Sequence, residues 1–517
     1  MVVENEDTVD IAELAAVLGP GEISGSQSGH ITAVSYTSGD VVPGTGFVAI
    51  RGRKTDGHSY IPDALERGAL LIVGEDPAPP GFPADRTYMR VADTRRALGA
   101  LSAAFYGYPT HGMEVIGVTG TDGKTTTTNL IDAILTSGGK RTGLMSTVEF
   151  KIGSERWPNN TRFTTLEAPD VQKLLRQMAE GGVEAAIVET TSSGLELQRV
   201  CGVEYDVAVI TNITSEHLEV HGTVENYRRA KAMLFEAVDP ARAKSVAVPH
   251  ACVLNADDAS FEYLQPFCRA PILSYGIQQP ASDIRASELR LEPSGTHFQV
   301  AFPGGERASV DTPLVGRFNV SNCLAALSVG YLHGVTPEAM AMALEKFPGV
   351  SGRMERIEAG QDFTVIVDYA HTAESLAKVL GVLRPVTTGR LIAVFGSAGE
   401  RDLVKRPEMG AVAARLADYS VITDEDPREE DAASILHDIA AGAMEVGALE
   451  GQDFVCIVGR RLAIATAFAM ARPGDTILLA GKGHEQSLVV GREKLPWDDR
   501  VVAREELMAR SFGGSAG

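Results

Sequence analysis

The sequence predicts an α/β protein with three domains, and three observations support this fold class. The chain has 517 residues, too many for one ordinary core and suited to three domains of about 150 residues each. Short apolar runs alternate with helical patterns, and a polar or glycine-rich loop follows each run at once. Proline and glycine interrupt both periodicities near residues 106–112 and again near 348–352. We therefore predict domains at residues 1–110, 111–348 and 349–517.

The apolar runs of the middle and last segments have the length and composition of buried parallel strands. They are residues 115–118, 185–188, 207–210, 365–367, 394–395, 421–422 and 477–480. In open α/β sheets, ligands bind outside the carboxyl ends of the strands. The polar residues after the runs, such as Glu189, Asp368 and Gly481, are therefore expected at the functional edge of a sheet. We predict a mononucleotide-binding central domain, a Rossmann-like C-terminal domain and a smaller N-terminal α/β domain.

Composition restricts the classes of function. The formal net charge of -21 argues against a nucleic-acid partner, because phosphate contacts need clustered lysine and arginine. The five cysteines are scattered without a Cys-x-x-Cys pair, so neither a disulfide framework nor a zinc site is expected. The acidic N-terminus lacks the pattern of a signal peptide, and no apolar run reaches about 18 residues. We expect a soluble, cytoplasmic protein without membrane insertion.

The strongest local motif is the glycine-rich stretch at residues 115–128, VIGVTGTDGKTTTT. A strand, a loop and then a helix N-terminus present unsatisfied backbone N–H groups to an anion. Lys124 is expected to reach the outer phosphates of a nucleotide, and the Thr125 hydroxyl to contact Mg²⁺. The spacing departs from Gly-x4-Gly-Lys, because Gly120 lies three residues before Gly123. A tight strand-to-helix turn without a ligand remains the alternative.

Three residues downstream are candidates for the same site. Glu189 comes directly after a predicted strand, and a carboxylate there suits Mg²⁺, although a helix-capping or solvated glutamate is the alternative. His217 follows another strand, and a lone histidine in that position is more typical of a structural role. Lys231 lies on a predicted helix, where a lysine is normally solvated. Residue spacing alone does not choose between these interpretations.

Motifs along nearly the whole chain resemble those of the Mur ligases. These motifs are GTDGKTTT at 120–127, Thr211-Asn212 with His217-Leu218, Tyr227-x-x-Ala230-Lys231, GRFN at 316–319 with Asn322, GRME at 352–355, VDYAHT at 367–372, Arg401-Asp402 with KRP at 405–407, and GKGHE at 481–485. In the first segment, residues 37–57 resemble the family's UDP-binding stretch. Order and spacing are similar to those of the members that add the third amino acid of the peptidoglycan peptide, the MurE type.

The resemblance implies ATP, two Mg²⁺ ions and a set of residues that hold them. The phosphate-binding residues would be Gly120, Thr121, Gly123, Lys124, Thr125 and Thr126. Further contacts to the nucleotide would come from Asn319, Asn322, Arg353, Asp368 and His371. The implied metal ligands are Thr125, Glu189, His217 and Lys231, the last as a carbamate that turns a cation into a carboxylate-like ligand. Catalysis is implied for Lys124, Glu189, His217 and Lys231.

The resemblance also implies small-molecule substrates and a monomer. Ser38 and His58 would hold the uridine diphosphate. Contacts to the muramoyl-dipeptide are implied for Thr164, Thr165, Ser192 and Arg199. Binding of the incoming amino acid is implied for Arg406, Asp426, Arg428, Gly481 and Glu485. The implied reaction joins a diamino acid to UDP-N-acetylmuramoyl-L-alanyl-D-glutamate through an acyl phosphate.

The identity of the diamino acid depends on the acidic segment at residues 424–431, DEDPREED. Arg428 favours meso-diaminopimelate, because a guanidinium pairs in bidentate fashion with a distal carboxylate. Asp426 adds a negative charge that favours an ammonium, as in L-lysine or L-ornithine. Mutual neutralisation of Asp426 and Arg428 is a further alternative. We favour diaminopimelate and keep lysine and ornithine open. More distant alternatives are a folylpolyglutamate-type ligase and a P-loop ATPase.

The chain departs from the family pattern at three places. Ser193 stands where the family has a histidine in Glu-Val-Ser-Ser-His-Ala-Leu. Thr37 and Gly39 replace the aspartate and arginine of the UDP-binding stretch. Glu425-Asp426-Pro427-Arg428 replaces Asp-Asn-Pro-Arg in the segment that selects the amino acid.

Overall fold

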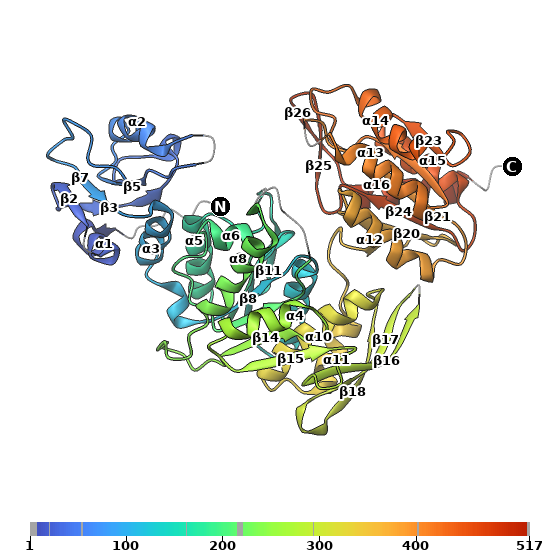
Figure 1. The fold of residues 1–517 in the computed structure, drawn as a ribbon, viewed down its shortest axis with the longest axis horizontal. Helices are drawn as coiled ribbons and strands as arrows, with labels where there is room; N and C mark the ends of the chain where they lie inside the picture. The colour runs from blue at the N-terminus through green and yellow to red at the C-terminus, as the bar shows by residue number, and fades with distance from the viewer. Residues whose placement is uncertain are drawn as a thin grey trace. The chain divides into compact units, whose positions relative to one another are not determined.

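The computed structural model describes residues 8–19, 21–52, 55–161, 163–214, 221–292, 294–400 and 403–513 (Figure 1). The chain forms two compact units. The first contains Met1–Ala286, Val300–Ala308 and Ser321–Ala343, and the second contains Ser287–Gln299, Ser309–Val320 and Leu344–Gly517. Each unit is described by itself below.

The N-terminal part of the first unit is a small sheet in the order β2-β7-β6-β5-β4. Its strands are β2 (Glu22–Gly25), β4 (Ala33–Ser35), β5 (Thr45–Val48), β6 (Leu71–Gly74) and β7 (Thr87–Arg90). Helices α1 (Ile11–Leu18) and α3 (Thr94–Phe105) cover one face, and α2 (Ile61–Glu66) covers the other (Figure 1). Because side chains alternate along a strand, Val48 joins the core under α1 and α3, whereas Phe47 joins the core under α2.

The larger sheet of the first unit has the order β11-β10-β9-β12-β8-β13-β14-β15. Its strands are β8 (Glu114–Thr119), β9 (Thr142–Met145), β10 (Glu149–Ile152), β11 (Glu155–Pro158), β12 (Ala185–Glu189), β13 (Val207–Ile210), β14 (Ala251–Asn255) and β15 (Ile272–Gly276). The strands from β9 to β15 pair in parallel, and β10 and β11 add an antiparallel edge. The order continues through β16 (Ile284–Glu292), β17 (Gly295–Ala301) and β18 (Arg307–Thr312), and the unit boundary falls inside β16.

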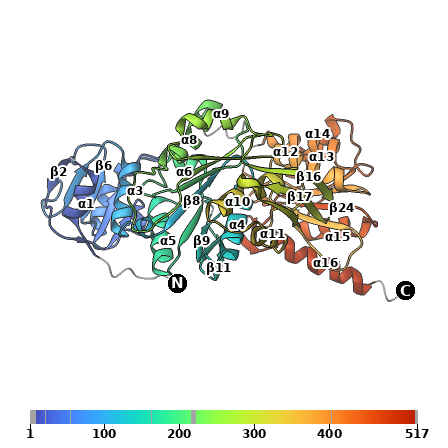
Figure 2. The same cartoon turned by 90° about the horizontal axis from the view of Figure 1, so that it is seen from below.

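Helices cover both faces of this sheet (Figure 2). The core on one face joins Val115 of β8 to Leu175 of α5 (Ala168–Glu180) and Leu234 of α8 (Val224–Ala237). Helix α4 (Lys124–Ser137) packs on β9 and β12 from the other face, where α10 (Arg317–Leu332) also lies. Short α6 (Ser192–Glu196) contacts α8, and α9 (Ser260–Leu264) and α11 (Pro337–Glu345) complete the described helices of this unit.

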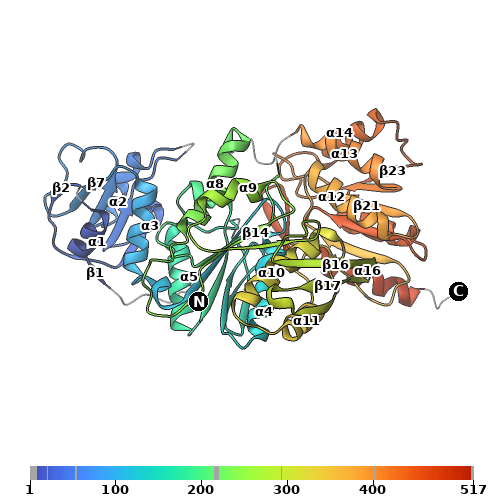
Figure 3. The ribbon, with the colours of Figure 1, turned by 60° about the horizontal axis from the view of Figure 1, so that its bottom comes forward.

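The second unit is built on a sheet in the order β19-β20-β24-β21-β22-β23. Its strands are β19 (Glu355–Arg356), β20 (Thr364–Asp368), β21 (Leu391–Phe395), β22 (Tyr419–Thr423), β23 (Phe454–Ile457) and β24 (Thr476–Ala480), with a separate hairpin of β25 (Ser487–Val490) and β26 (Glu493–Pro496). Its helices are α12 (Ala373–Leu383), α13 (Lys405–Leu416), α14 (Ala432–Glu445), α15 (Arg460–Met470) and α16 (Asp499–Gly513). Helices α12 to α14 pack on one face and α15 and α16 on the other (Figure 3).

The structure confirms the α/β fold class and the position of the polar clusters. Glu189, Asp368 and Thr423 are the last residues of parallel strands, and Gly481 follows β24 directly. The candidate residues therefore lie at the carboxyl edges of two sheets, where open α/β folds bind ligands. Throughout the part of the chain that is described, no helix is both long and apolar enough to cross a bilayer.

Candidate active-site residues

The glycine-rich loop connects β8 to the N-terminus of α4, as the sequence predicts. Gly120 has φ +150° and Gly123 has φ +82°, so both occupy backbone conformations that side chains rarely adopt. A Cβ on Gly120 would lie 1.8 Å from the Thr211 Oγ1 atom, and one on Gly123 would lie 2.3 Å from the Asn322 Oδ1 atom. The loop therefore requires glycine at both positions, and its backbone N–H groups lie at the positive end of the α4 dipole.

Two lysine amines lie against this loop. The Lys124 Nζ atom donates to the carbonyl oxygens of Gly120 (3.0 Å) and Thr121 (2.7 Å). The Lys231 Nζ atom donates to the same Gly120 oxygen at 2.6 Å and lies 4.4 Å from the centre of the Tyr227 ring. Lys231 is only 1% exposed, so the prediction that a helical lysine is solvated is wrong here. Burial beside the phosphate loop favours the functional interpretation of this lysine.

Glu189 connects the phosphate loop to the neighbouring strand ends. Its Oε1 atom accepts a hydrogen bond from the Thr125 hydroxyl (3.0 Å), and its Oε2 atom accepts one from the Thr147 backbone N–H (2.8 Å). The carboxylate is 1% exposed and lies at the carboxyl end of the sheet rather than capping a helix. Carboxylate and hydroxyl oxygens are the ligand types that Mg²⁺ prefers, so Glu189 and Thr125 fit a magnesium site.

The residues expected to contact the muramoyl-dipeptide gather around the same strand end. The Thr165 hydroxyl donates to the Glu189 carbonyl (3.1 Å), and Thr164 accepts a hydrogen bond from the Thr147 hydroxyl (3.0 Å). Arg199 donates to the Thr165 carbonyl at 3.2 Å, and its Nη2 atom is 2.7 Å from the Glu167 carboxylate. This hydrogen-bonded set connects the substrate candidates to the metal candidates.

His221 is a buried residue of this region that the sequence reasoning missed. Its Nε2 atom lies 3.0 Å from the hydroxyl of Ser192, the first residue of α6, and its ring centre is 5.2 Å from that of Tyr227. The Tyr227 hydroxyl in turn hydrogen-bonds with Thr121 of the phosphate loop (3.0 Å). The only available signal was a second histidine four residues after His217. His217 itself lies outside the described residues, as do Ser215 and Glu216.

The two candidates of the first segment are held by neighbouring polar groups. The His58 Nε2 atom accepts a hydrogen bond from the Glu75 backbone N–H at 2.8 Å, so its Nδ1 atom carries the proton donated to Asp56 at 2.6 Å. Ser38 begins a short 3-10 helix, and its hydrogen bond to the Asp63 carboxylate lowers the pKa of that group. Both ring nitrogens of His58 are thus used within the protein.

The nucleotide candidates Asn319 and Asn322 lie one turn apart on α10. The Asn319 Nδ2 atom donates to the Val315 carbonyl at 2.9 Å and so fixes the start of the helix. The Asn322 Oδ1 atom accepts a hydrogen bond from the Thr127 hydroxyl at 3.4 Å. Asn322 therefore lies against the first turn of α4, next to the phosphate loop.

In the second unit, Asp368 organises the carboxyl end of β20. Its carboxylate accepts hydrogen bonds from the backbone N–H groups of Met354 and Ala370, each at 2.8 Å. The Arg353 guanidinium stacks 4.6 Å from the centre of the Tyr369 ring, and the His371 ring lies 4.6 Å from the same ring. The sequence-predicted residues Arg353, Asp368 and His371 thus form one cluster.

His484 packs on the other side of that cluster, with its ring centre 5.0 Å from Tyr369. Burial, followed by the positive charges of Arg353 and Arg500, lowers the pKa of His484 to about 3. The imidazole is therefore neutral at physiological pH, and its Nδ1 atom is buried with no hydrogen-bond partner in the described part of the chain. A neutral imidazole can offer a hydrogen-bond acceptor to a ligand where an imidazolium cannot.

The acidic segment after β22 has a charge pairing that the sequence did not predict. Asp426 does not pair with Arg428. Its Oδ1 atom accepts hydrogen bonds from Lys482 Nζ (2.9 Å) and from the Val489 N–H (2.9 Å), and Lys482 also contacts Glu485 at 2.7 Å. Lys482 is 1% exposed and lies between two carboxylates.

Arg428 has a left-handed backbone with φ +55°. Its Nη1 atom lies 3.8 Å from the Glu400 carboxylate, which is too long for a hydrogen bond. Its Nε atom is buried and has no hydrogen-bond partner within the described residues. Arg428 therefore retains a donor for an anionic ligand.

Two further residues of the second unit surround this segment. Arg406 is buried and donates to Glu430 of the acidic segment (2.8 Å) and to Asp438 of α14 (3.0 Å). It therefore connects the acidic segment to α14. Glu425 is buried beside Gly481, and burial raises the pKa of its carboxyl to about 7. Sequence reasoning did not single out Glu425, because its local pattern is that of an ordinary acidic loop. Residues Arg401 and Asp402 of the matching motif lie outside the described residues.

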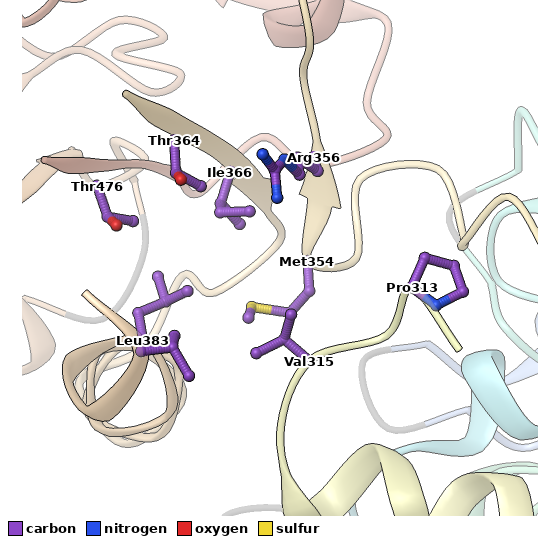
Figure 4. A pocket seen from close by; sticks show the side chains of 9 residues that line it. Pro313, Val315, Met354, Arg356, Thr364, Ile366, Leu383 and Thr476 are labelled. Atoms are coloured by element: carbon purple, nitrogen blue, oxygen red, sulfur yellow. The ribbon is translucent and has the colours of Figure 1, made fainter. Parts of the chain in front are cut away.

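A separate pocket in the second unit contains none of the predicted site residues (Figure 4). It is lined by Pro313, Val315, Met354, Arg356, Thr364, Ile366, Leu383, Val386 and Thr476. Its volume of about 30 Å³ is that of a water molecule or so, too small for a nucleotide or an amino acid. In each unit, the candidate residues described above lie elsewhere, at or near the carboxyl edge of that unit's sheet.

Comparison with known proteins gives matches to three parts of one family. The family models are the Mur ligase family, catalytic domain (residues 30–106), the Mur ligase middle domain (118–330) and the Mur ligase, glutamate ligase domain (352–483). Together they cover most of the chain, including the phosphate loop and the acidic segment.

Individual relatives agree with these family models. The chain is 50% identical over 501 residues to the UDP-N-acetylmuramyl-tripeptide synthetase of Roseiflexus sp. (strain RS-1), covering 94% of this chain and 96% of that protein. It is 42% identical over 484 residues to the UDP-N-acetylmuramoyl-L-alanyl-D-glutamate--2,6-diaminopimelate ligase of Geobacillus thermodenitrificans (strain NG80-2), covering 93% and 95%. A solved structure of a ligase of the latter name is 30% identical, has a TM-score of 0.68 and is covered in full, with 98% of this chain matched. The chain belongs to the Mur ligase family.

Proposed function

We propose that this protein is a MurE-type ligase that uses ATP to join a diamino acid to UDP-N-acetylmuramoyl-L-alanyl-D-glutamate, a step of peptidoglycan precursor synthesis. The observation that carries the proposal is the connection from the glycine-rich loop through Thr125 to Glu189. It brings the glycine-rich loop and a buried carboxylate together at one sheet edge, in a chain that is 50% identical to a UDP-N-acetylmuramyl-tripeptide synthetase.

The chemistry requires activation of a carboxylate, because its oxygen is a poor leaving group. Transfer of the γ-phosphoryl group of ATP to the D-glutamate carboxylate gives an acyl phosphate. The amine of the incoming diamino acid attacks the acyl carbon, and phosphate leaves as the amide forms. Phosphoryl transfer depends mainly on positioning and on neutralising charge. Lys124 is suited to neutralise the phosphates, and the hydrogen-bonded set of Thr165 and Arg199 is suited to hold the dipeptide.

Bound Mg²⁺ would neutralise phosphate charge and orient the phosphates. We assign Thr125, Glu189, His217 and Lys231 as the residues that hold two such ions. As an ammonium, Lys231 would be repelled by a metal cation. Reaction of its amine with CO2, with release of a proton, gives a carbamate whose oxygens attract the metal instead. The burial of Lys231 at the Gly120 carbonyl supports this assignment, because it puts the amine at the phosphate loop.

Replacement of Lys231 by alanine tests the carbamate. We expect kcat to fall by at least about 100-fold, because a metal ligand is lost. Short carboxylic acids should partly restore activity by occupying the vacated space. The matched control is Lys151→Ala, which removes a buried lysine that pairs with Asp132 at 2.6 Å. Acids should not restore that variant, and a Lys231 variant that no acid restores would overturn the carbamate.

For the amino acid, we propose meso-diaminopimelate. The support is the charge balance of the acidic segment. The Lys482 ammonium donates a hydrogen bond to Asp426, which lowers the attraction of Asp426 for a second ammonium. Arg428 has a buried Nε donor without a hydrogen-bond partner in the described chain, and the distal carboxylate of diaminopimelate supplies an acceptor of the required geometry.

The experiment offers the purified enzyme ATP and UDP-muramoyl-dipeptide with meso-diaminopimelate, L-lysine or L-ornithine in turn. We expect tripeptide formation chiefly with diaminopimelate. Turnover with lysine or ornithine instead would overturn the choice of amino acid but not the ligase. Phosphate release that depends on a pteroylglutamate would favour a folate ligase. Release indifferent to all acceptors would favour an ATPase.

We also propose the organisation in which the enzyme works. Residues 1–110 would bind the UDP moiety, 111–348 ATP, and 349–517 the amino acid. The net charge of -21 is unsuited to nucleic acid, and the substrates are small molecules. ATP and nucleotide-linked precursors are cytoplasmic metabolites, so we assign the enzyme to the cytoplasm. We propose separately that it is a monomer. Light scattering at assay concentration measures the oligomeric state directly.

A further inference from the structure

A fully buried ion pair in the second unit connects two loops that carry the amino-acid candidates. Arg460 is the first residue of α15, and Asp499 is the first residue of α16. The Arg460 Nε and Nη2 atoms donate to the two carboxylate oxygens of Asp499 at 2.8 and 2.6 Å. Both side chains are 0% exposed. The Trp497 indole N–H donates to the same carboxylate at 2.8 Å and fixes its orientation.

The remaining guanidinium donors point to two strand ends. The Nη1 atom donates to the carbonyl of Asp424 (3.1 Å), directly after β22, and the Nη2 atom donates to the carbonyl of Ala480 (2.9 Å), the last residue of β24. Asp426 and Arg428 follow the first carbonyl within four residues, and Gly481 and Glu485 follow the second within five. One side chain therefore contacts the starting points of both loops.

Sheet pairing connects the strands before these loops only through β21. In the order β20-β24-β21-β22-β23, strand β21 lies between β24 and β22, so no ladder hydrogen bond joins the two strands. The planar guanidinium spans this gap with donors in a fixed fork. Lysine has one point charge and cannot make the same set of bonds. The Gly459 N–H adds a bond to the Asp424 carboxylate at 2.7 Å on the same loop.

We infer that Arg460, oriented by Asp499, is a positioning residue that sets the register of the two amino-acid loops and thereby the affinity for the diamino acid. The identity of the substrate in this inference rests on the proposed function. The contacts of Arg460 with the two loops do not depend on it. The inference assigns a role in specificity to a residue whose side chain is fully buried. A purely structural ion pair would affect all substrates equally, which makes the two roles separable.

The test compares two double variants of the full-length protein. Arg460→Met with Asp499→Leu removes both buried charges together, which avoids the unpaired charge that a single substitution would leave. The matched control is Arg390→Met with Asp475→Leu. It removes another Arg–Asp pair, in which the Arg390 Nε (3.2 Å) and Nη2 (2.7 Å) atoms both donate to the Asp475 Oδ2 atom, immediately before β21 and β24 at the opposite edge of the same sheet.

We expect the Arg460/Asp499 variant to raise the KM for the diamino acid by about 10- to 100-fold, because small misplacements of binding groups are costly. The KM values for ATP and for UDP-muramoyl-dipeptide should stay within about 2-fold of wild type, because within the described chain Arg460 does not contact the loops proposed to bind them. The control variant should leave all three KM values unchanged. Equal increases for all substrates, or no increase, would overturn the positioning role.

Hydrogen–deuterium exchange gives a readout that does not depend on turnover. In the Arg460/Asp499 variant, backbone amides at 424–431 and 481–485 should exchange faster together, while those at 120–128 stay unchanged. If wild type makes no tripeptide with any diamino acid, the proposed function fails, whereas this exchange pattern still decides the positioning role. If the double variant does not fold, Arg460→Lys replaces it. Unchanged exchange and KM in Arg460→Lys would equally overturn the inference.

Discussion

The phosphate loop of the first unit and the acidic segment of the second unit both follow a parallel strand, yet they are held in different ways. The loop at 120–123 also has distant partners, Lys231 and Tyr227, but its path depends on two glycines in positive-φ conformations. The segment at 424–431 is held by charges whose partners are distant in the sequence, such as Lys482, 56 residues from Asp426. Backbone shape can be recognised in a short motif, whereas distant charge pairing cannot.

This difference predicts how each region responds to substitution. Under the proposed function this loop binds the phosphates of ATP, whose chemistry does not vary, so a change there should lower turnover strongly. In the acidic segment, several charged side chains would contribute to binding the amino acid, so a single substitution should shift the selectivity between amino acids by a smaller amount. Three substitutions test the contrast, in descending order of effect.

The largest effect is expected from Lys124→Met. The change keeps the side-chain length but removes the positive charge expected at the transferred phosphoryl group. We predict that kcat falls by about 10³-fold or more, as when other charges at a transferring phosphoryl group are lost. Steady-state phosphate release measures it. Retention of more than about a tenth of wild-type kcat would mean that this lysine is not a phosphate ligand.

Gly120→Ala should have the next largest effect. The new Cβ would lie 1.8 Å from the Thr211 Oγ1 atom, so the loop must move. We predict a loss of about 100-fold in kcat/KM for ATP, the typical result of misplaced binding groups. Gly139→Ala is the control, because Gly139 also has positive φ (+86°) but no heavy atom lies within 4 Å of its Cβ position. Equal losses in both variants would show that the effect is only backbone strain.

Asp426→Asn should have the smallest effect. It restores the family's neutral residue and leaves Lys482 paired with Glu485. The segment gains one net positive charge, which favours a distal carboxylate by about 1 kcal/mol. We predict that the ratio of kcat/KM for diaminopimelate to that for L-lysine rises by about 5-fold. Glu429→Gln is the control, since its partner Arg492 is exposed on the protein surface. An opposite shift in the ratio would show that Asp426 contacts an ammonium.

Much of the fold could be predicted from the sequence because buried parallel strands are short apolar runs. The runs at 115–118 and 185–188 correspond to β8 and β12, and their register puts Thr125 beside Glu189. Glycine and strand patterns are local, so they are visible without a structure. The resemblance to the Mur ligases added roles for residues such as Lys231 that composition alone assigned to solvent.

The rest depended on pairs that local patterns do not encode. Nothing near Asp426 indicates that Lys482 neutralises it, and nothing near Arg460 indicates Asp499 as its partner. Each pair forms because helices and loops from distant segments meet at one sheet edge. His221 escaped notice for the same reason, since its contact Ser192 is 29 residues away.

The position of Asp499 at the beginning of α16 has a practical consequence for handling this enzyme. Through the Asp499 carboxylate, α16 binds Arg460, and Arg460 in turn binds the backbone at the start of the two loops at 424–431 and 481–485. Truncation before α16, or a rigid fusion partner that displaces this helix, would therefore remove or shift the partner of Arg460. We expect weaker binding of the amino acid as a result. Affinity tags for this protein are better joined through a long, pliable spacer after the helix.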